Sequence, residues 1–365
     1  MKRTSFRKAL VPGVAALALA LSACGAANES EAGSDTEGAE TSSLSGTLNG
    51  AGASSQEAAQ GAWRAGFQTA NSDVTVNYDP VGSSGGREQF IAGGVAFAGS
   101  DSYLDEDEIA AASETCGTEP LQLPAYISPI AVIYNVEGLT DLKLDATTIA
   151  AIFDGSITKW NDAAIADLNP DADLPDATIN PVHRGDGSGT TENFTEYLAA
   201  AGGWSHEPSD EWPLTSGEAA SGTSGVVAAV TDNTFTIGYA DASQAGELSK
   251  VLVGVGDDFV APDADAAAKI IEASPRVDES SEVNFAVDID HETTEAGTYP
   301  IVLASYLLAC QSYDDAATAD LVNGYLTYVL GADGQAASAE SAGSAPVSGG
   351  VADAALAAVE KIAAN

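Results

Sequence analysis

Three short segments of this chain combine glycine with serine or threonine, a combination suited to holding a small anion. They are Gly-Ala-Gly-Ala-Ser-Ser at 50–55, Gly-Ser-Ser-Gly-Gly at 82–86 and Gly-Asp-Gly-Ser-Gly-Thr at 185–190. Each follows a strand-like stretch and precedes a helix-like one. The first turn of a helix leaves N–H groups unpaired, and glycine lets the backbone approach an anion closely. One such segment is more often an ordinary helix cap, whereas three in one chain favour an oxyanion site.

The third segment carries the strongest signal because Arg184 precedes it and Asp186 lies within it. The planar guanidinium group of arginine matches two oxygens of a tetrahedral oxyanion. Asp186 can fix the plane of that group through an ion pair, or it can form an Asx turn, and the two roles are compatible. The neighbouring His183 is expected to be a packing or surface residue.

Asp101 follows the stretch Phe-Ala-Gly-Ser at 97–100 and offers a means of distinguishing between anions. Phosphate carries one or two protons at neutral pH, so a carboxylate can accept a hydrogen bond from its P–OH group. Sulfate has no proton to donate, and a desolvated carboxylate without a partner is strongly unfavourable. Asp101 therefore acts as a filter for phosphate or, in the simpler interpretation, as a turn or cap residue before a helix at 104–112.

The composition limits the class of protein. The chain has 365 residues, 45% hydrophobic and 18% charged, which is enough for two soluble domains. Its net charge of −41 argues against binding to nucleic acid or to anionic lipid. Most carboxylates are expected to form a solvated surface. A protein this acidic must hold an anion with local dipoles and few cations.

An enzyme such as a phosphatase is a weaker interpretation. Hydrolysis needs an activated nucleophile or a metal-bound water, and the three histidines show no metal-ligand spacing. We therefore expect no catalytic residue, no metal site and no cofactor.

The first residues resemble an export signal of the lipoprotein type. Four basic residues lie within 2–8, a short apolar run fills 9–21, and Leu-Ser-Ala precedes Cys24. We expect 1–23 to be a signal peptide and Cys24 to be acylated; the alternative is an ordinary signal peptide with a chance cysteine. Residues 24–43 lack large apolar side chains and are expected to be a disordered tether to the membrane.

Two further cysteines remain, Cys116 and Cys310. In an exported protein such a pair favours a disulfide over a metal site or a nucleophile. The chain-entropy model values a bridge over so long a loop at roughly 5 kcal/mol. A bridge would also return a late segment of the chain to an early one.

Strand-like and helix-like stretches alternate along the chain, which predicts an α/β architecture with mainly parallel sheets. Strands are expected at 44–49, 74–78, 122–135, 178–183, 235–239 and 300–308. Helices are expected at 56–70, 87–91, 147–153, 161–168, 192–201, 225–231 and 316–330.

The C-terminal segments leave two alternatives open. Residues 335–350 are low in complexity and suit a disordered linker. The periodic apolar residues at 351–362 favour a terminal helix that docks on a domain, and we slightly favour this interpretation.

Taken together, these segments resemble the periplasmic phosphate-binding protein family (PstS-like), whose members are receptors of the ABC-type phosphate importer. In that family similar glycine–hydroxyl turns, a Ser-Asp pair and an Arg-x-Asp-Gly-Ser-Gly-Thr turn cage dehydrated phosphate. The resemblance covers 44–362. It implies ligands at Ser54, Ser55 (through its backbone N–H), Ser83, Asp101, Arg184, Ser188, Gly189 (through its backbone N–H) and Thr190, with Asp186 supporting Arg184.

One departure from the family pattern concerns the first turn. The family commonly continues this turn with Thr-Phe-Pro, whereas this chain has Ser54, Ser55 and Gln56. The hydroxyl survives at Ser54, and any residue supplies the N–H at position 55. Whether the Ser55 hydroxyl also reaches the ligand is left open.

The resemblance implies a two-lobed periplasmic-binding-protein fold with two mixed, mainly parallel sheets flanked by helices and the ligand in the cleft between the lobes. The strands at 122–135 and 300–308 would be the crossovers. Lobe I would comprise 44–128 and 300–365, and would contain both cysteines of the bridge; lobe II would comprise 129–299. Closure about a hinge is the expected response to ligand.

The sequence thus predicts a monomeric, lipid-anchored, extracytoplasmic protein. It would capture inorganic phosphate and deliver it to the permease subunits of an ABC importer, without binding nucleic acid. The alternatives are a receptor of the same fold for another tetrahedral oxyanion (sulfate or molybdate) and, with less support, a phosphatase-like enzyme. An additional sensing or adhesion role is also left open.

Overall fold

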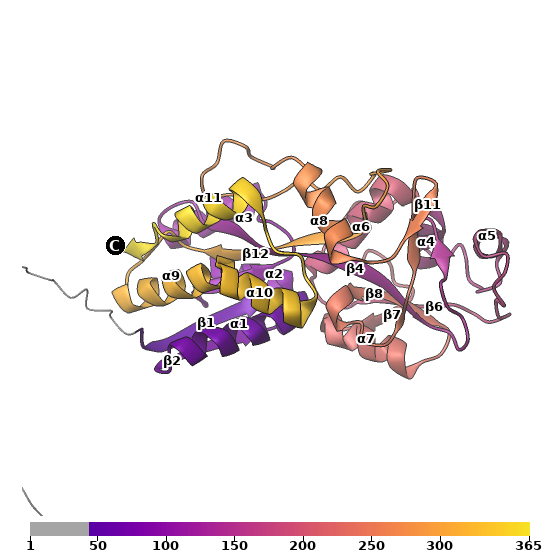
Figure 1. The fold of residues 1–365 in the computed structure, drawn as a ribbon, viewed down its shortest axis with the longest axis horizontal. Helices are drawn as coiled ribbons and strands as arrows, with labels where there is room; N and C mark the ends of the chain where they lie inside the picture. The colour runs from indigo at the N-terminus through magenta and orange to yellow at the C-terminus, as the bar shows by residue number, and fades with distance from the viewer. Residues whose placement is uncertain (1–43) are drawn as a thin grey trace, which may run out of the picture. The chain divides into compact units, whose positions relative to one another are not determined.

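The computed structural model describes residues 44–365, all of which belong to one unit of the chain (Figure 1). The expected signal peptide at 1–23, the tether at 24–43 and Cys24 lie outside the described residues. From residue 44 onward, no helix combines the length and the apolar character needed to span a bilayer.

The order of elements follows the predicted alternation, and most predicted elements are present within a few residues. The strands are β1 Gly46–Gly52, β2 Val74–Asp79, β3 Phe97–Ser100, β4 Leu121–Asn135, β5 Lys143–Leu144, β6 Asn180–Arg184, β7 Glu218–Ala220, β8 Thr236–Asp241, β9 Ser249–Lys250, β10 Leu252–Val255, β11 Asp258–Val260, β12 Val302–Ala309, β13 Ser312–Tyr313 and β14 Ala363–Ala364. The helices are η1 Ser54–Gln56 (a 3₁₀ turn), α1 Glu57–Ala70, α2 Ser83–Ile91, α3 Glu106–Cys116, α4 Ala146–Phe153, α5 Ala163–Leu168, α6 Gly189–Gly202, α7 Gly222–Asp232, η2 Ala242–Gln244, α8 Ala264–Ala273, α9 Ala316–Leu330, α10 Ala332–Ala342 and α11 Gly349–Val359.

One continuous sheet of nine strands replaces the two sheets expected from the sequence. Its order is β2-β1-β3-β12-β4-β8-β6-β7, with β9 also paired to β4. The strands β2, β1 and β3 are parallel to one another, and so are β8, β6 and β7. Between these groups β12 and β4 pair antiparallel with their neighbours. The sheet is therefore mixed, with two parallel ends joined by an antiparallel centre.

The two ends are joined because β4 is long enough to serve both. Its residues Leu121–Pro129 pair with β12, and Ile130–Asn135 pair with β8. All but the last residue of β4 are buried, as a strand covered on both faces requires. Figure 1 shows β4 running from the β1 half of the fold, which contains β1–β3 and β12, into the β8 half, which contains β6–β8.

Helices cover the sheet because each presents a regular apolar face. In α1 the buried residues Ala59, Trp63 and Phe67 have the spacing expected from the sequence. In the β1 half α1 lies beside α10 (Figure 1), and the indole N–H of Trp63 donates to the carbonyl of Gly334 at 2.8 Å. In the β8 half α7 packs on β8 and β6, and α4 packs on α6.

The disordered-linker interpretation of 335–350 is wrong. Most of that stretch lies in α10 and α11, and the side chain of Gln335 is buried within the fold. Its amide donates to the carbonyls of Ala125 at 2.7 Å and Val329 at 2.9 Å, and its carbonyl accepts from the N–H of Val347 at 3.0 Å. These hydrogen bonds tie the low-complexity segment to β4 and α9. The expected terminal helix is also present as α11, which packs against α9.

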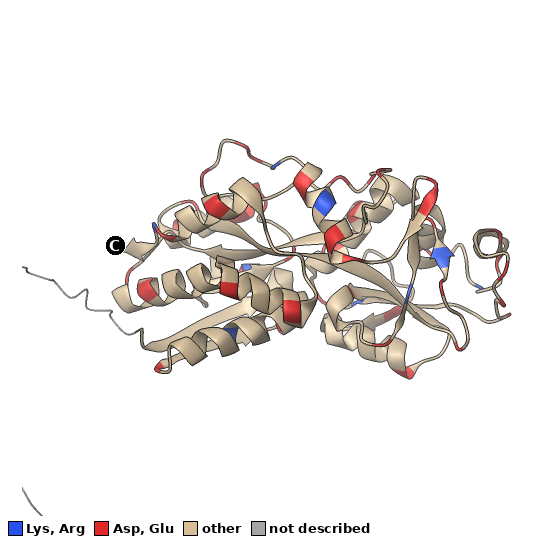
Figure 2. Cartoon of the chain, viewed as in Figure 1, with Lys and Arg blue, Asp and Glu red and all other residues tan. Residues whose placement is uncertain are grey.

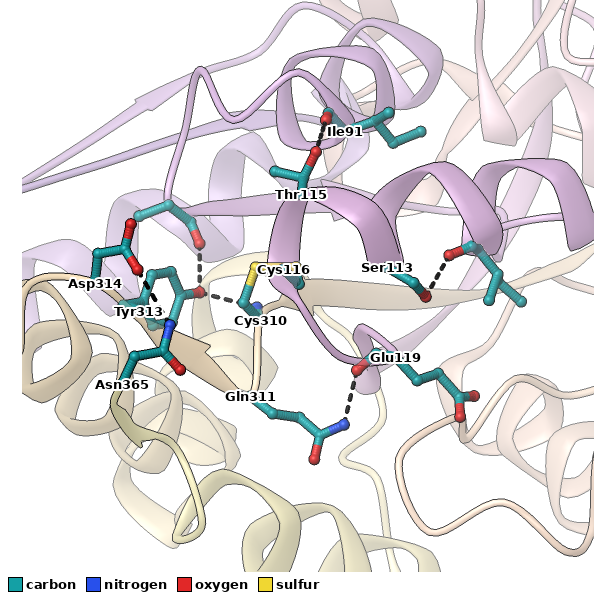
Figure 3. Close-up of a disulfide and its surroundings, with 12 residues drawn as sticks. Ile91, Ser113, Thr115, Cys116, Glu119, Cys310, Gln311, Tyr313, Asp314 and Asn365 are labelled. Atoms are coloured by element: carbon teal, nitrogen blue, oxygen red, sulfur yellow. Dashed lines mark hydrogen bonds between the residues drawn. A yellow bond between two sulfur atoms is a disulfide. The ribbon is translucent and has the colours of Figure 1, made fainter.

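A disulfide joins Cys116 at the end of α3 to Cys310 just after β12, as the sequence indicated, with a Cα–Cα distance of 5.2 Å. Figure 3 shows the bridge beside Tyr313, whose hydroxyl accepts from the N–H of Cys310 at 3.0 Å and donates to the carbonyl of Ala96 at 2.7 Å. The bridge therefore anchors the end of the returning strand β12 to the end of α3.

The acidic residues are spread over the surface. Figure 2 shows Asp and Glu on helices and loops throughout the described chain, with Lys and Arg at far fewer places. Among residues 44–365, only Asp101 and Asp241 are acidic residues that are fully buried. A carboxylate in this protein is thus normally solvated, and a buried one requires an explanation.

Candidate anion site

The predicted glycine–hydroxyl segments all lie where a strand ends and a helix begins. The segment 50–55 links β1 to η1, the segment 82–86 leads into α2, and the segment 185–190 links β6 to α6. Asp101 directly follows β3. Seven of the predicted ligand residues are at most 4% exposed: Ser54, Ser55, Ser83, Asp101, Arg184, Ser188 and Thr190.

The carboxylate of Asp101 is the centre of a cluster of hydroxyl groups. It accepts hydrogen bonds from Ser55 at 2.6 Å, from Thr190 at 2.9 Å and from Ser305 at 2.7 Å. The backbone N–H of Asp101 also donates to the hydroxyl oxygen of Ser83 at 3.1 Å. We call these five residues the Asp101 cluster. It joins three of the predicted segments, and it shows that the Ser55 hydroxyl is directed at Asp101.

The protonation of Asp101 reflects opposing influences. Burial raises the pKa of Asp101, whereas the hydroxyls of Ser55, Ser305 and Thr190 and the charge of Arg184 lower it. Two of the donors share the oxygen Oδ2, and one binds Oδ1. A carboxylate offers about four acceptor positions, so one position on Oδ1 is open to a further donor. A hydroxyl on a tetrahedral anion can supply that donor.

Arg184 ends β6 beside the cluster, and its orientation is fixed by Asp186. The guanidinium Nε donates to Asp186 Oδ1 at 2.8 Å, and Nη2 pairs with Oδ2. The same Oδ1 accepts from the N–H of Gly222 at 2.9 Å. Although burial acts to raise the pKa of Asp186, the hydrogen bonds and charge of Arg184 lower it below its usual range. Asp186 therefore lies where the sequence analysis expected it, as a charged partner of Arg184.

Ser188 is the N-cap of α6, because its hydroxyl accepts from the N–H of Thr191 at 3.2 Å. The cap role and the anion-binding role are compatible, since the hydroxyl proton is still free to donate. Gly189 and Thr190 form the first turn of α6, where backbone N–H groups have no partner within the helix. Ser54 accepts from the N–H of Thr223 at 3.0 Å, which adds the start of α7 to the site.

The two glycine turns approach each other too closely for larger residues. Gly82 has a φ of 90°, and a Cβ placed there would lie 2.5 Å from the carbonyl oxygen of Gly187. Glycine at position 82 is therefore required both by the backbone conformation and by the opposite turn.

Sequence reasoning missed several residues that complete the site. Asp210 accepts from the hydroxyl of Ser84 at 2.5 Å and pairs with Arg87 at 3.1 Å, linking the 203–217 loop to α2. Ser305 and Thr223 were also missed. Ser305 is the one serine in a largely apolar buried strand, and Thr223 ends a fourth glycine–hydroxyl turn at 221–223. Both features can be recognised in the sequence.

His183 takes no part in the cluster. Its ring stacks on Trp212 at a centroid distance of 5.0 Å, and its Nδ1 lies 2.8 Å from the carbonyl of Arg184. This is the packing role expected from the sequence. Across residues 44–365, no group of three or more His, Cys, Asp or Glu side chains is arranged to hold a metal ion.

A pocket of about 400 Å³ opens beside the Asp101 cluster, and Asp101, Glu192, Tyr103 and Tyr306 are among the residues that line it. Burial raises the pKa of Glu192 to about 7, with the negative charge of Glu196 acting in the same direction. Glu192 thus titrates near neutral pH at the edge of the site.

Comparison with known proteins gives a consistent set of matches. A family model described as a PBP superfamily domain matches residues 37–333. The phosphate-binding protein PstS 3 of Mycobacterium leprae (strain TN) is 34% identical over 341 residues, covering 91% of this chain and 92% of the relative. The protein of the same name from Mycobacterium tuberculosis (strain ATCC 25618 / H37Rv) is 36% identical over 334 residues, covering 89% and 90%.

Solved structures share the fold at lower sequence identity. A high-affinity periplasmic phosphate-binding protein, PfluDING, solved with phosphate, aligns with a TM-score of 0.71 at 22% identity, covering 86% of this chain and 93% of that one. A phosphate-bound structure from Clostridium perfringens, described as a putative phosphate ABC transporter substrate-binding protein, aligns with a TM-score of 0.61 at 19% identity, covering 83% and 100%. These likenesses establish the two-lobed α/β fold.

Proposed function

This chain belongs to the PBP superfamily and, within it, to the PstS-like phosphate-binding proteins, and from that premise we propose that it captures inorganic phosphate for an ABC importer. It is a binding protein rather than an enzyme, and its ligand needs no cofactor. The observation that best supports phosphate is the meeting of the Arg184 turn with the buried carboxylate of Asp101.

The proposed ligand set divides into holding groups and one selecting group. Arg184, Ser188 and the start of α6 offer donors that hold any tetrahedral oxyanion. Asp101 is the selecting group, because its open acceptor position requires a proton on the anion. The holding donors are proposed to be Ser54, the Ser55 N–H, Ser83, Arg184, Ser188, the Gly189 N–H and Thr190, the last through its N–H because its hydroxyl proton points at Asp101.

We further propose that the protein opens and closes as two lobes. Lobe I would comprise 44–128 and 300–365, and lobe II 129–299, with the hinge where β4 changes partner between Pro129 and Ile130. Several contacts cross this division at the site, including the hydrogen bond of Thr190 to Asp101. The segment around α8 also packs on β4 and pairs with Gln122, so part of the proposed lobe II lies against both halves.

The location and partners are proposed from the N-terminal sequence and the family. Acylation of Cys24 would anchor the protein to the outer face of the cytoplasmic membrane, with residues 24–43 as the tether. The binding domain would act there as a monomer and would pass phosphate to the permease subunits. Replacement of Cys24 by alanine should move the protein from the detergent phase to the aqueous phase in a partitioning assay.

Calorimetric titration with phosphate and with sulfate, in buffer stripped of phosphate, tests the proposed function. The wild-type protein should bind phosphate and strongly prefer it to sulfate. Asp101→Asn replaces an acceptor by an amide and removes a hydrogen bond to a charged group, so the preference should fall about 10- to 100-fold. Asp107→Asn, in the exposed first turn of α3, makes the same change of charge and should leave the preference intact. An unchanged preference in Asp101→Asn would contradict the proposed role of Asp101.

A further inference from the structure

Ser305 donates to the carboxylate oxygen of Asp101 that the side chains of the anion-binding turns do not contact. It lies in β12, is fully buried, and donates to Asp101 Oδ1 at 2.7 Å. Its hydroxyl oxygen accepts from the side-chain amide of Gln56 at 2.9 Å, and the same amide donates to the carbonyl of Tyr306 at 2.9 Å. Because the N–H of Gln56 points at the oxygen of Ser305, the single proton of Ser305 is left for Asp101.

The orientation of Gln56 is itself fixed by a buried chain of donors. The carbonyl oxygen of Gln56 accepts from the amide of Gln60 at 2.9 Å, and the carbonyl oxygen of Gln60 accepts from the hydroxyl of Tyr325 at 2.8 Å. All four side chains in the chain from Tyr325 to Ser305 are 0% exposed. Every hydrogen bond donates in the direction of Asp101. The hydrogen bonds in such a directional chain polarise one another. A flipped side-chain amide would leave buried polar groups unpaired.

This chain of hydrogen bonds ends on Asp101 Oδ1. Among residues 44–365, no hydrogen bond of the Gln56, Gln60 or Tyr325 side chain reaches the Arg184 turn, so these side chains influence a bound anion through Ser305 and Asp101. Other charged or titratable groups face Asp101 from the packed elements: Tyr78 of β2, Tyr126 of β4, Arg184 of β6, Asp241 of β8 and, across the adjoining pocket, Glu192 of α6.

We propose that Gln56 and Ser305 are specificity-determining positioning residues, which hold Asp101 as an acceptor with one open position and so admit only an anion that carries a proton. This inference rests on the proposed function and deepens it. Without the Ser305 donor, Asp101 loses one of the hydrogen bonds that offset its burial. Asp101 would then become protonated at higher pH, and a protonated Asp101 can donate to the oxygens of sulfate.

Ser305→Ala and Gln56→Met test the proposal, with Ser338→Ala as the matched control. Ser338 is also a fully buried serine that donates to a carbonyl, but it lies in α10. The first measurement follows the titration of the Asp101 carboxyl by ¹³C NMR in protein free of anions. The second is calorimetric binding of phosphate and sulfate at pH 5 and pH 8.

In Ser305→Ala the carboxyl of Asp101 should titrate at a higher pH than in the wild type. The preference for phosphate over sulfate should fall about tenfold at pH 5 and less at pH 8, because a higher pH favours the ionised carboxylate in both proteins. Gln56→Met should change both quantities in the same direction by a smaller factor. Ser305→Thr, which retains the hydroxyl, should restore both, and Ser338→Ala should match the wild type.

Two results would overturn this inference and leave the proposed function intact. One is a wild-type preference for phosphate that Ser305→Ala leaves unchanged at both pH values. The other is an equal weakening of both anions at both pH values, which would show a merely structural role. A wild-type protein that does not prefer phosphate would overturn the proposed function as well as this inference.

Discussion

Replacing Asp210 with asparagine should accelerate the release of phosphate. Asp210 belongs to the proposed lobe II, whereas its partners Ser84 and Arg87 belong to α2 in the proposed lobe I. If the protein opens as proposed, these contacts are made only in the closed form. Their loss therefore acts on the closed form and hardly affects the open one.

The magnitude follows from burial and from the remaining partners. The Arg87 side chain is 8% exposed and that of Asp210 is 25% exposed, so the pair is only partly screened. Arg87 also pairs with Glu108 of α3 at 2.9 Å, so it is not left without a partner when Asp210 is neutralised. A charge-assisted hydrogen bond in this setting contributes about 1–2 kcal/mol, which corresponds to a release rate about 5- to 30-fold higher.

The release rate can be measured by loading the protein with radioactive phosphate and mixing it with an excess of unlabelled phosphate. The association rate should change little, because the open form has not yet made the contact. Glu211→Gln is the matched control, since Glu211 is the exposed neighbour and its replacement changes the net charge equally. An unchanged release rate in Asp210→Asn, or an equal increase in Glu211→Gln, would refute the reasoning.

Two further predictions concern the stability of the fold, and a third concerns phosphate binding. Replacing both Cys116 and Cys310 by serine should lower the free energy of unfolding in urea by about 5 kcal/mol, because the bridge joins residues 194 apart; a change below about 1 kcal/mol would contradict this. Burial raises the pKa of Glu192 to about 7 from 4.5, so folding takes up a proton and wild-type stability falls as pH rises through that interval. Glu192→Gln should thus stabilise the protein by about 3 kcal/mol at pH 8 and little at pH 4.5, and equal effects at both pH values would rule this out. Gly82→Ala should weaken phosphate binding in calorimetry, because its Cβ would lie 2.5 Å from the Gly187 carbonyl oxygen; full affinity would show that the turns can separate without loss.

The local features of the fold could be predicted from the sequence because they depend on short-range patterns. The helix expected at 316–330 has the same bounds as α9, and the continuous apolar run at 122–135 is the buried strand β4. The three glycine–hydroxyl turns were recognisable because each lies between a strand and a helix. Such signals require only neighbouring residues.

The remaining features depend on partners far apart in the chain. Nothing near Ser305 in the sequence shows that it faces Asp101, and nothing near Asp210 shows that it meets Arg87. The helix α10 was obscured because its Ala, Ser and Gly residues have little hydrophobic contrast. Its order comes from tertiary contacts, such as the amide of Gln335 on the carbonyl of Ala125 in β4.

The return of the chain to its first half determines the order in which the protein can fold during synthesis. The strand β3 is completed by β12, with Phe97 beside Ala309, and α1 is covered by α10. A nascent chain that has reached residue 300 therefore lacks the strand that pairs with both β3 and β4. Pairing over such separations is slow, because the entropy of closing a long loop is lost before the contacts that compensate for it can form. The growing polypeptide thus stays without a finished β1 half until its last segments emerge.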